Sequence, residues 1–155
     1  MHPNCEAVQA ILAAAGVPGR IRILDAAAAT APAAAALVGV DVGAIANSLV
    51  FATAEGEAVL VLTSGAHRVD TAKAAALLGT PALSRATPEF VHAATGQRIG
   101  GVAPVGHPVP LRTLVDTALE RYPQVWAAGG VAHAVFPTTF AELVRLTGGT
   151  PADVA

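Results

Sequence analysis

The chain has 155 residues, a length typical of one domain, so residues 1–155 are expected to form a single domain. Hydrophobic residues make up 54% of the chain and aromatic residues only 4%, which predicts a core of Val, Leu, Ile and Ala. The net charge of −2 argues against a wide basic surface for nucleic acid, because such binding strengthens with the number of phosphates neutralised. No DNA partner is therefore expected.

Membrane and disulfide classes are disfavoured as well. No apolar run reaches the roughly 18 residues that a membrane span requires, and the N-terminus lacks a signal-type segment. The single cysteine, Cys5, excludes an internal disulfide. We expect a cytoplasmic protein that binds no membrane.

The first elements are two helices and a strand. Asn4 is a candidate N-cap of a helix that ends at Gly16, and residues 20–24 alternate between polar and apolar, as in a half-buried strand. A second helix is predicted from Thr30 to Val38, ended by Gly39.

A hairpin and two further helices follow. Residues 48–53 and 57–63 are β-prone runs joined by a turn, and the second run is apolar enough for a strand buried on both faces. Asp70 caps a helix that stops at Gly79. Residues 87–89 begin a short helix that ends at Gly96.

The last third is mostly β-structure, with three candidate strands at 111–115, 125–128 and 132–136. Residues 139–142 form a capping-box pattern for a final helix, which ends at Gly148, and the tail 150–155 is expected to be loose. Strands grouped in this way favour an α+β fold with a mixed sheet over a regular βαβ alternation.

Standard catalytic motifs are mostly missing. The segment 100–106 is rich in glycine but fits neither a P-loop nor a dinucleotide fingerprint; it is either a turn or bulge, or a loop whose N–H groups approach a ligand. Ser64 follows a strand, yet no base can be assigned to it. Metal and cofactor are not expected, since no helical pair or Cys/His set is formed by His2, His67, His92, His107 and His133.

Several segments, in order, carry a resemblance to one family: 45–51, 59–65, 68–73, 94–96, 100–106, 128–130 and 139–143. The most specific piece is Thr95-Gly96 followed closely by Gly100-Gly101-x-x-Pro104. Over residues 30–149 this succession resembles the YbaK/prolyl-tRNA synthetase-associated family of aminoacyl-tRNA editing domains. The resemblance implies a mixed, partly curled sheet surrounded by helices.

The resemblance also implies a function. Members of the family hydrolyse the ester of a small mischarged amino acid on tRNA, often tRNA(Pro), without a metal, and the terminal adenosine hydroxyl of the tRNA helps to position the water. The expected partner is aminoacyl-tRNA, held by weak and local contacts, with prolyl-tRNA synthetase as a further candidate. An ester-cleaving site of this kind must orient the carbonyl, place a water and stabilise the oxyanion.

Site residues follow from the same resemblance. The catalytic candidates are Asn47, His133 and the backbone N–H groups of Gly100 and Gly101, and the substrate-binding candidates are Ser48, Ser64, Gly65, Lys73 and Pro104. Non-functional alternatives remain for two of them: His133 as a hydrogen-bonded histidine of the sheet, and Lys73 as part of a solvated helix face.

Asn47 departs from the family pattern. Many relatives carry a lysine there, which contacts the substrate. Asparagine keeps the hydrogen-bonding ability but removes the charge. The site then uses a different polar contact, prefers another substrate, or is inactive, unless Asn47 is an ordinary strand residue. The rival functions are a non-catalytic binding module for aminoacyl-adenosine or a small metabolite, a synthetase-docking protein, and an interaction-only scaffold.

Overall fold

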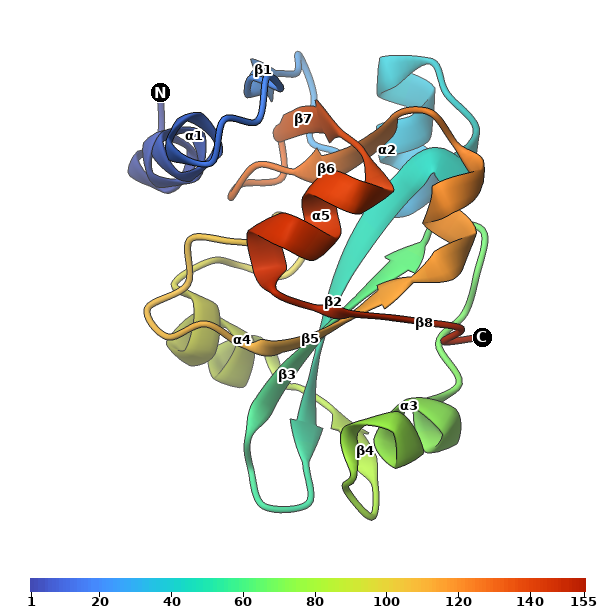
Figure 1. Ribbon diagram of the computed structural model, residues 1–155. Helices are drawn as coiled ribbons and strands as arrows, with labels where there is room; N and C mark the ends of the chain where they lie inside the picture. The colour runs from blue at the N-terminus through green and yellow to red at the C-terminus, as the bar shows by residue number, and fades with distance from the viewer.

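The computed structural model describes all 155 residues. Its helices are α1 (Pro3–Ala14), α2 (Ala31–Val38), α3 (Thr71–Leu78), α4 (Pro88–Thr95) and α5 (Phe140–Thr147), with 3₁₀ turns η1 (Val42–Ala44) and η2 (Thr117–Arg121). Its strands are β1 (Arg22–Ile23), β2 (Ile45–Thr53), β3 (Ala58–Ser64), β4 (Leu83–Arg85), β5 (Arg112–Asp116), β6 (Val125–Ala128), β7 (Ala134–Thr138) and β8 (Thr150–Ala152) (Figure 1).

One mixed sheet holds the eight strands in the order β1-β7-β6-β2-β3-β5-β8, with β4 pairing separately with β2. β2 lies at its centre, and the next strand, β3, is antiparallel to β2 and parallel to β5. The predicted hairpin is confirmed, and β3 is buried from Val59 to Ser64, as expected of a strand covered on both faces. The predicted α+β class with a mixed sheet is thereby confirmed.

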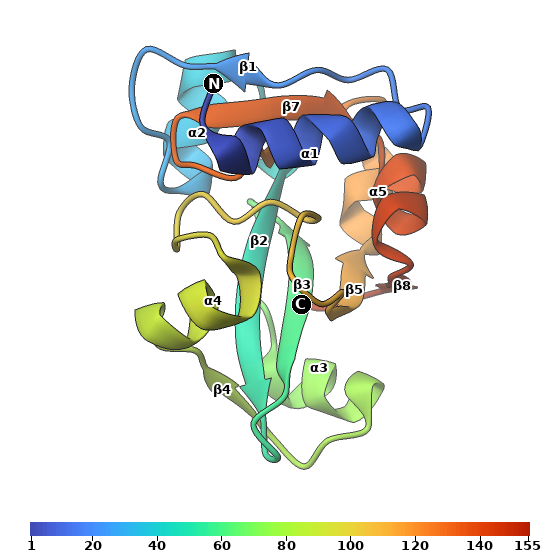
Figure 2. The same ribbon diagram turned by 90° about the vertical axis from the view of Figure 1, so that its left-hand side faces the viewer.

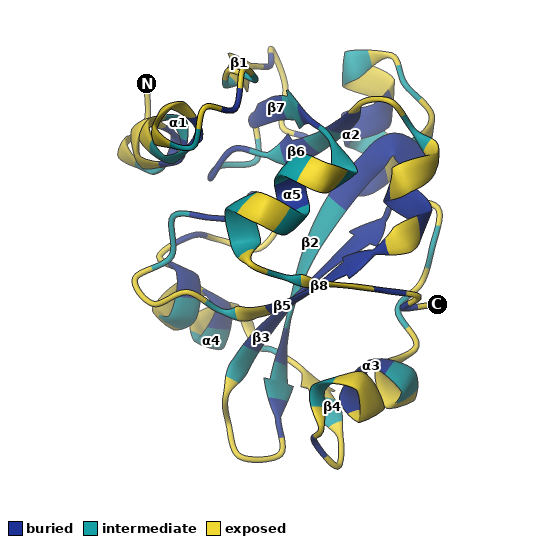
Figure 3. Ribbon diagram, viewed as in Figure 1, coloured by how far each residue is buried: buried dark blue, intermediate teal, exposed yellow.

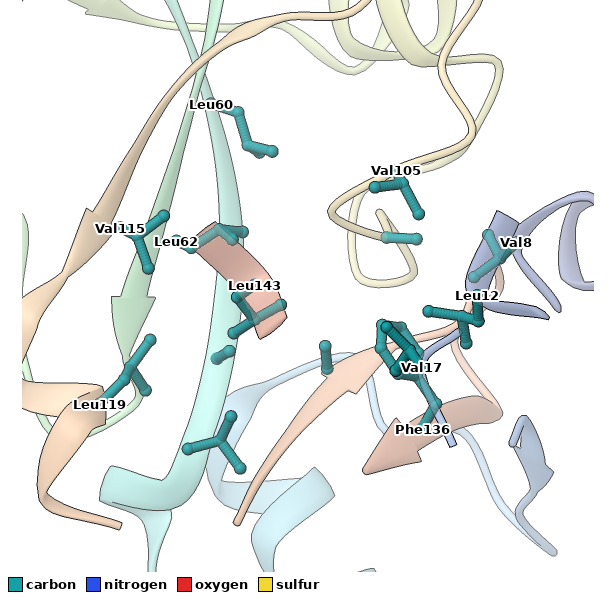
Figure 4. Packing of buried hydrophobic residues seen from close by; sticks show 14 residues of the cluster. Val8, Leu12, Val17, Leu60, Leu62, Val105, Val115, Leu119, Phe136 and Leu143 are labelled. Atoms are coloured by element: carbon teal, nitrogen blue, oxygen red, sulfur yellow. The ribbon is translucent and has the colours of Figure 1, made fainter. Parts of the chain in front are cut away.

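The core is aliphatic, as the composition predicts. Its largest cluster contains 14 buried residues and packs α1 and α5 against one face of the sheet (Figure 4). Phe136 is the largest side chain within it and is fully buried. A second cluster packs α2 on the opposite face, and a third joins α3 to the far end of the hairpin. In Figure 3 the central strands are correspondingly mostly buried and the outer faces of the helices exposed.

Helix boundaries follow the local signals closely. Four helices begin at a side chain that accepts a hydrogen bond from a backbone N–H three residues on, namely Thr30, Asp70, Thr87 and Thr139. The same four end at glycines with positive φ, namely Gly39, Gly79, Gly96 and Gly148. The capping box at α5 is only half formed, because the Glu142 carboxylate accepts from the Thr138 hydroxyl at 3.1 Å instead of from the backbone of Thr139.

Two local predictions are wrong, and one short strand was missed. Asn4 does not cap α1: the ring of His2 accepts from the backbone N–H of Asn4 at 3.0 Å, and Pro3 occupies the first turn. The strand predicted at 20–24 shortens to two residues, and both are exposed rather than half-buried. The short strand β4 was not predicted, because three residues leave too little pattern to detect.

The tail is also ordered, against expectation. β8 pairs in parallel with β5, and the side chain of Val154 is completely buried. The carbonyl of Val154 accepts from the N–H of Asp70 at 2.8 Å, which ties the C-terminus to the start of α3. Burying a valine fully contributes about 1.5–3 kcal/mol, which adds to the pairing of β8 with β5 in offsetting the entropy lost when the tail is ordered.

No helix in this structure is both long and apolar enough to cross a membrane.

Candidate functional site

A cavity of about 800 Å³ lies where one edge of β2 lacks a strand partner. β6 pairs with β2 only at Ile45 and Ala46, and β4 pairs only from Phe51 to Thr53, so residues 47–50 have no neighbouring strand on that edge. Figure 2 shows β2 running the height of the molecule, from the end beside β7 and α2 down to β4. The walls come from α2, the segment before α3, β4 and the loop after α4.

The register of β2 decides which groups face this gap. The N–H of Gly65 donates to the Ile45 carbonyl at 2.8 Å, so the odd-numbered residues of β2 turn their backbone groups toward β3. The backbone groups of Ser48 and Val50 therefore point to the open edge. A sheet edge of this kind offers N–H donors and C=O acceptors to a ligand.

Side chains of β2 alternate between two faces. Ile45 packs with α2, and we call its side of the sheet the α2 face; Ala46 packs with α1 and α5, and we call its side the α1 face. Asn47 therefore lies on the α2 face and Ser48 on the α1 face. Both line the cavity, which reaches around the free edge of the strand.

The two glycines of the loop after α4 play different parts. Gly100 lines the cavity with φ +92, a conformation that favours glycine, and its N–H has no acceptor within the protein. Gly101 is buried behind it, and its N–H donates to the Arg98 carbonyl at 3.0 Å. Of these two glycines, only Gly100 has a free N–H to offer an oxyanion.

Two amide side chains hold this loop in place. Gln97 is buried; its Oε1 accepts from the N–H of Ala103 at 2.7 Å, and its Nε2 donates to the Val105 carbonyl at 3.4 Å. Asn4 donates to the carbonyls of Gly96 at 3.5 Å and Gly130 at 3.2 Å, linking α1 to the two loops. Neither role was predicted, since both depend on contacts between distant segments.

Four predicted site residues come together in the cavity, namely Asn47, Ser48, Gly65 and Gly100. The other predicted residues do not line it. Ser64 is buried, with its hydroxyl donating to the Gly43 carbonyl at 2.8 Å. Lys73 donates to Asp153 at 2.8 Å and to the Ala155 carbonyl at 3.0 Å, which ties it to the C-terminus. His133 is exposed outside the cavity, and Pro104 lines a second cavity of about 190 Å³.

Three residues that were not predicted also line the cavity: Arg68, Arg85 and Trp126. Both arginines are exposed and form no ion pair with the chain. Trp126 stacks beneath the guanidinium of Arg22, 5.9 Å from the ring centre. Its rarity was a usable signal, because it is the only tryptophan in a chain poor in aromatic residues.

A buried carboxylate fixes the end of β3 beside the cavity. Asp116, 1% exposed, accepts from the backbone N–H groups of Ser64 and Ala118, both at 2.9 Å. It also accepts from the Thr63 hydroxyl at 3.3 Å, and Nδ1 of His67 lies 2.9 Å from it. These contacts use the carboxylate to hold the end of β3 in place, and they orient the turn that contains Gly65.

The second cavity contains a histidine with an altered titration. Burial lowers the pKa of His107, although its contact with the Ala103 carbonyl, 2.8 Å from Nε2, acts in the opposite direction. Burial likewise raises the pKa of the Cys5 thiol, which keeps it protonated and unreactive. No group of three or more His, Cys, Asp or Glu side chains is placed to hold a metal ion.

Comparison with known proteins adds a family. The aminoacyl-tRNA editing domain family matches residues 25–146. A solved structure of a proposed trans-editing enzyme for prolyl-tRNA synthetase superposes with a TM-score of 0.91 at 46% identity, covering 99% of this chain and 98% of the other.

Two curated sequences are similar over shorter stretches. YwhH of Bacillus subtilis (strain 168), a protein of uncharacterised function, is 31% identical over 115 residues, which are 74% of this chain and 73% of YwhH. A proline–tRNA ligase of Nitratidesulfovibrio vulgaris (strain DP4) is 39% identical over 85 residues, 55% of this chain but only 15% of the ligase.

Proposed function

Since the chain belongs to the aminoacyl-tRNA editing domain family and is thereby an aminoacyl-tRNA deacylase, we propose that it acts in trans on tRNA charged with a wrong, small amino acid. The relatives tied to prolyl-tRNA synthesis support tRNA(Pro) as the tRNA and prolyl-tRNA synthetase as a partner. A cytoplasmic location is part of the same proposal, because charged tRNA is used there.

One observation carries the proposal: the cavity at the free edge of β2 brings Asn47, Ser48, Gly65 and Gly100 together around a space large enough for an aminoacyl nucleoside. These residues come from β2, the turn after β3 and the loop after α4, and only the fold collects them.

Hydrolysis of the aminoacyl ester needs only a few fixed polar groups. Water attacks the ester carbonyl, a tetrahedral oxyanion forms, and the carbon–oxygen bond to the terminal ribose breaks as the proton of the water passes to the ribose oxygen. The free N–H of Gly100 donates to the oxyanion, and the amide of Asn47 orients the carbonyl or the water. A fixed donor of this kind is worth about 10²–10³ in kcat.

Charge at the cavity comes from Arg68 and Arg85, whereas the relatives' lysine at position 47 is absent. Both guanidinium groups lack carboxylate partners and suit the phosphates next to the terminal adenosine. Lys73, a substrate-binding candidate by resemblance, is tied instead to Asp153 and the C-terminus. Two charges at the mouth of a cavity also fit a protein with a net charge of −2, which binds RNA locally rather than along a broad surface.

The test is a deacylation assay across tRNA(Pro) and two other tRNAs, each charged with Ala, Ser, Thr, Cys or 2-aminobutyrate. The expected result is release of at least one small amino acid, at a rate that falls when Asn47→Ala is used. Binding of charged tRNA without release from any of them would instead favour the binding module. Unchanged rates in Asn47→Ala would remove that residue from the site.

A further inference from the structure

Two buried polar side-chain atoms in this protein have no hydrogen-bond partner: Oγ of Ser48 and Nε1 of Trp126. Both residues line the cavity at the edge of β2. Buried polar groups are nearly always paired, and an unpaired one costs about 1–3 kcal/mol. Because both atoms belong to residues that line the same cavity, a ligand that seats against these side chains can supply the missing partners.

The two atoms lie on opposite sides of the strand edge. Trp126 pairs with Ile45 across the parallel β2–β6 ladder and packs with it against α2, so it lies on the α2 face, the face of Asn47. Ser48 stands opposite Leu62, a member of the cluster under α1 and α5, so it lies on the α1 face.

We propose that the free edge of β2 divides the cavity into two subsites, with the 3′-terminal nucleotide on the α2 face, held by the Trp126 indole N–H, and the amino acid on the α1 face, held by the Ser48 hydroxyl. This rests on the proposed function for the identity of the ligand. The ester then spans the edge, where the backbone groups of Ser48 and Val50 are free.

Chemistry assigns the nucleotide to the α2 face. An indole N–H only donates, so its partner must be an acceptor such as a ribose or phosphate oxygen, and it cannot be the α-ammonium of the amino acid. Arg85 lies on the same face, because it pairs with Phe51. Phe51 and Asn47 are both odd-numbered residues of β2, and their side chains therefore lie on the same face of the sheet. Arg68 directly precedes Val69, which packs in the cluster of Phe51.

The α1 side suits a small amino acid. Val50 lies on this face two residues beyond Ser48 and packs with the cluster under α1 and α5, and it lines the cavity together with the buried residues Val91 and Val102. Among these apolar side chains, the Ser48 hydroxyl is the polar group of the strand that can form a hydrogen bond with the amino acid. A hydroxyl both donates and accepts, so it pairs with a side-chain hydroxyl or thiol or with the α-ammonium.

The first experiment uses intrinsic fluorescence, which reports on Trp126 alone because the chain has one tryptophan. The probe is 3′-alanylamino-3′-deoxyadenosine 5′-monophosphate, whose amide resists hydrolysis. A saturable change in tryptophan emission, with the same Kd as calorimetry gives, is the expected result. Binding seen by calorimetry with unchanged emission would overturn the assignment of the α2 face.

The second experiment separates the subsites with two variants. Trp126→Phe keeps an aromatic ring but loses the N–H, and should raise the Kd of the probe and of adenosine 5′-monophosphate by about 2- to 12-fold, the worth of one net hydrogen bond. It should leave the ranking of amino acids in deacylation unchanged. Ser48→Ala should alter that ranking and leave the Kd of adenosine 5′-monophosphate unchanged.

Tyr122→Phe is the matched control, since it removes one polar group outside the cavity and should change neither readout. If both cavity variants moved both readouts equally, or neither did, the division into two subsites would be wrong. The emission and Kd readouts need no turnover, and if the wild-type protein hydrolyses no ester, the ranking is taken from the Kd values of probes that differ only in their aminoacyl group. Absence of deacylation by the wild-type protein would therefore count against the proposed function alone.

Discussion

Adding one methyl group at Gly101 should separate the loop after α4 from the loop before β7. A Cβ at this position would lie 2.5 Å from the carbonyl carbon of Val131 and 2.6 Å from the backbone nitrogen of Ala132. These are backbone atoms, which cannot rotate away as a flexible side chain could. Gly101→Ala must therefore push the two loops apart, and Gly100 moves with its neighbour.

The magnitude follows from the distances. The nearest approach of 2.5 Å is 0.9 Å shorter than the 3.4 Å at which ordinary van der Waals contact begins. Overpacking of this kind costs about 1–3 kcal/mol. At about 2–4 °C per kcal/mol for a chain of this length, Tm should fall by about 2–12 °C. Misplacement of a site group by about 1 Å costs about 10²-fold in rate, so kcat/KM should fall by about that factor.

The assay pairs thermal unfolding with deacylation of the best substrate, using Gly56→Ala as the control. Gly56 has φ +84, a Cβ added there would meet no atom within 4 Å, and the residue lies in the hairpin turn outside the cavity. That variant carries a backbone penalty of about 1–2 kcal/mol but should keep its kcat/KM. If both variants lost similar stability and Gly101→Ala kept full activity, the placement of Gly100 in the site would be refuted.

Three further predictions concern the cavity and its supports. Replacing Arg68 and Arg85 together by Gln should reduce the slope of log(kcat/KM) against log[salt] by about 1.4, or about 0.7 for each phosphate that is no longer neutralised. The control is Arg121→Gln, which lies outside the cavity and should leave this slope unchanged. Gln97→Ala leaves the buried N–H of Ala103 unpaired and should cost about 1–3 kcal/mol in urea unfolding; a smaller loss would mean that Gln97 does not brace the loop. Folding lowers the pKa of His107 from 6.5, so the unfolded chain binds a proton at this residue more readily than the folded chain does. The neutral, buried His107 therefore contributes its full stability well above pH 6.5. That contribution is lost as the pH falls from 6.5 through the lower pKa of the folded state. Urea unfolding between about pH 5 and about pH 8 should show this loss, and His107→Asn should flatten it.

Elements with local chemistry were predictable from the sequence. Thr30, Asp70, Thr87 and Thr139 cap their helices because a short oxygen-bearing side chain reaches a backbone N–H three residues on, whatever the rest of the fold does. The hairpin of β2 and β3 is equally local. The family was predictable as well, because its ordered motifs lie in the sequence itself.

Where local chemistry allowed two outcomes, tertiary contacts chose between them. Asn4 has the chemistry of a cap, yet its amide is used to join the loops at Gly96 and Gly130. The tail reads as loose on its own, yet pairing with β5 and the burial of Val154 order it. Neither contact leaves a trace in the neighbouring residues.

The site divides in the same way. The resemblance to the editing-domain family pointed to Asn47, Ser48, Gly65 and Gly100, and the fold gathers these four residues at one cavity. That cavity exists because β6 and β4 each cover only one end of β2, and Trp126 shares a face with Asn47 because a parallel ladder pairs Trp126 with Ile45, far away in the chain. Sequence determines which groups a segment can offer; only the pairing of distant strands decides which of them face the same space.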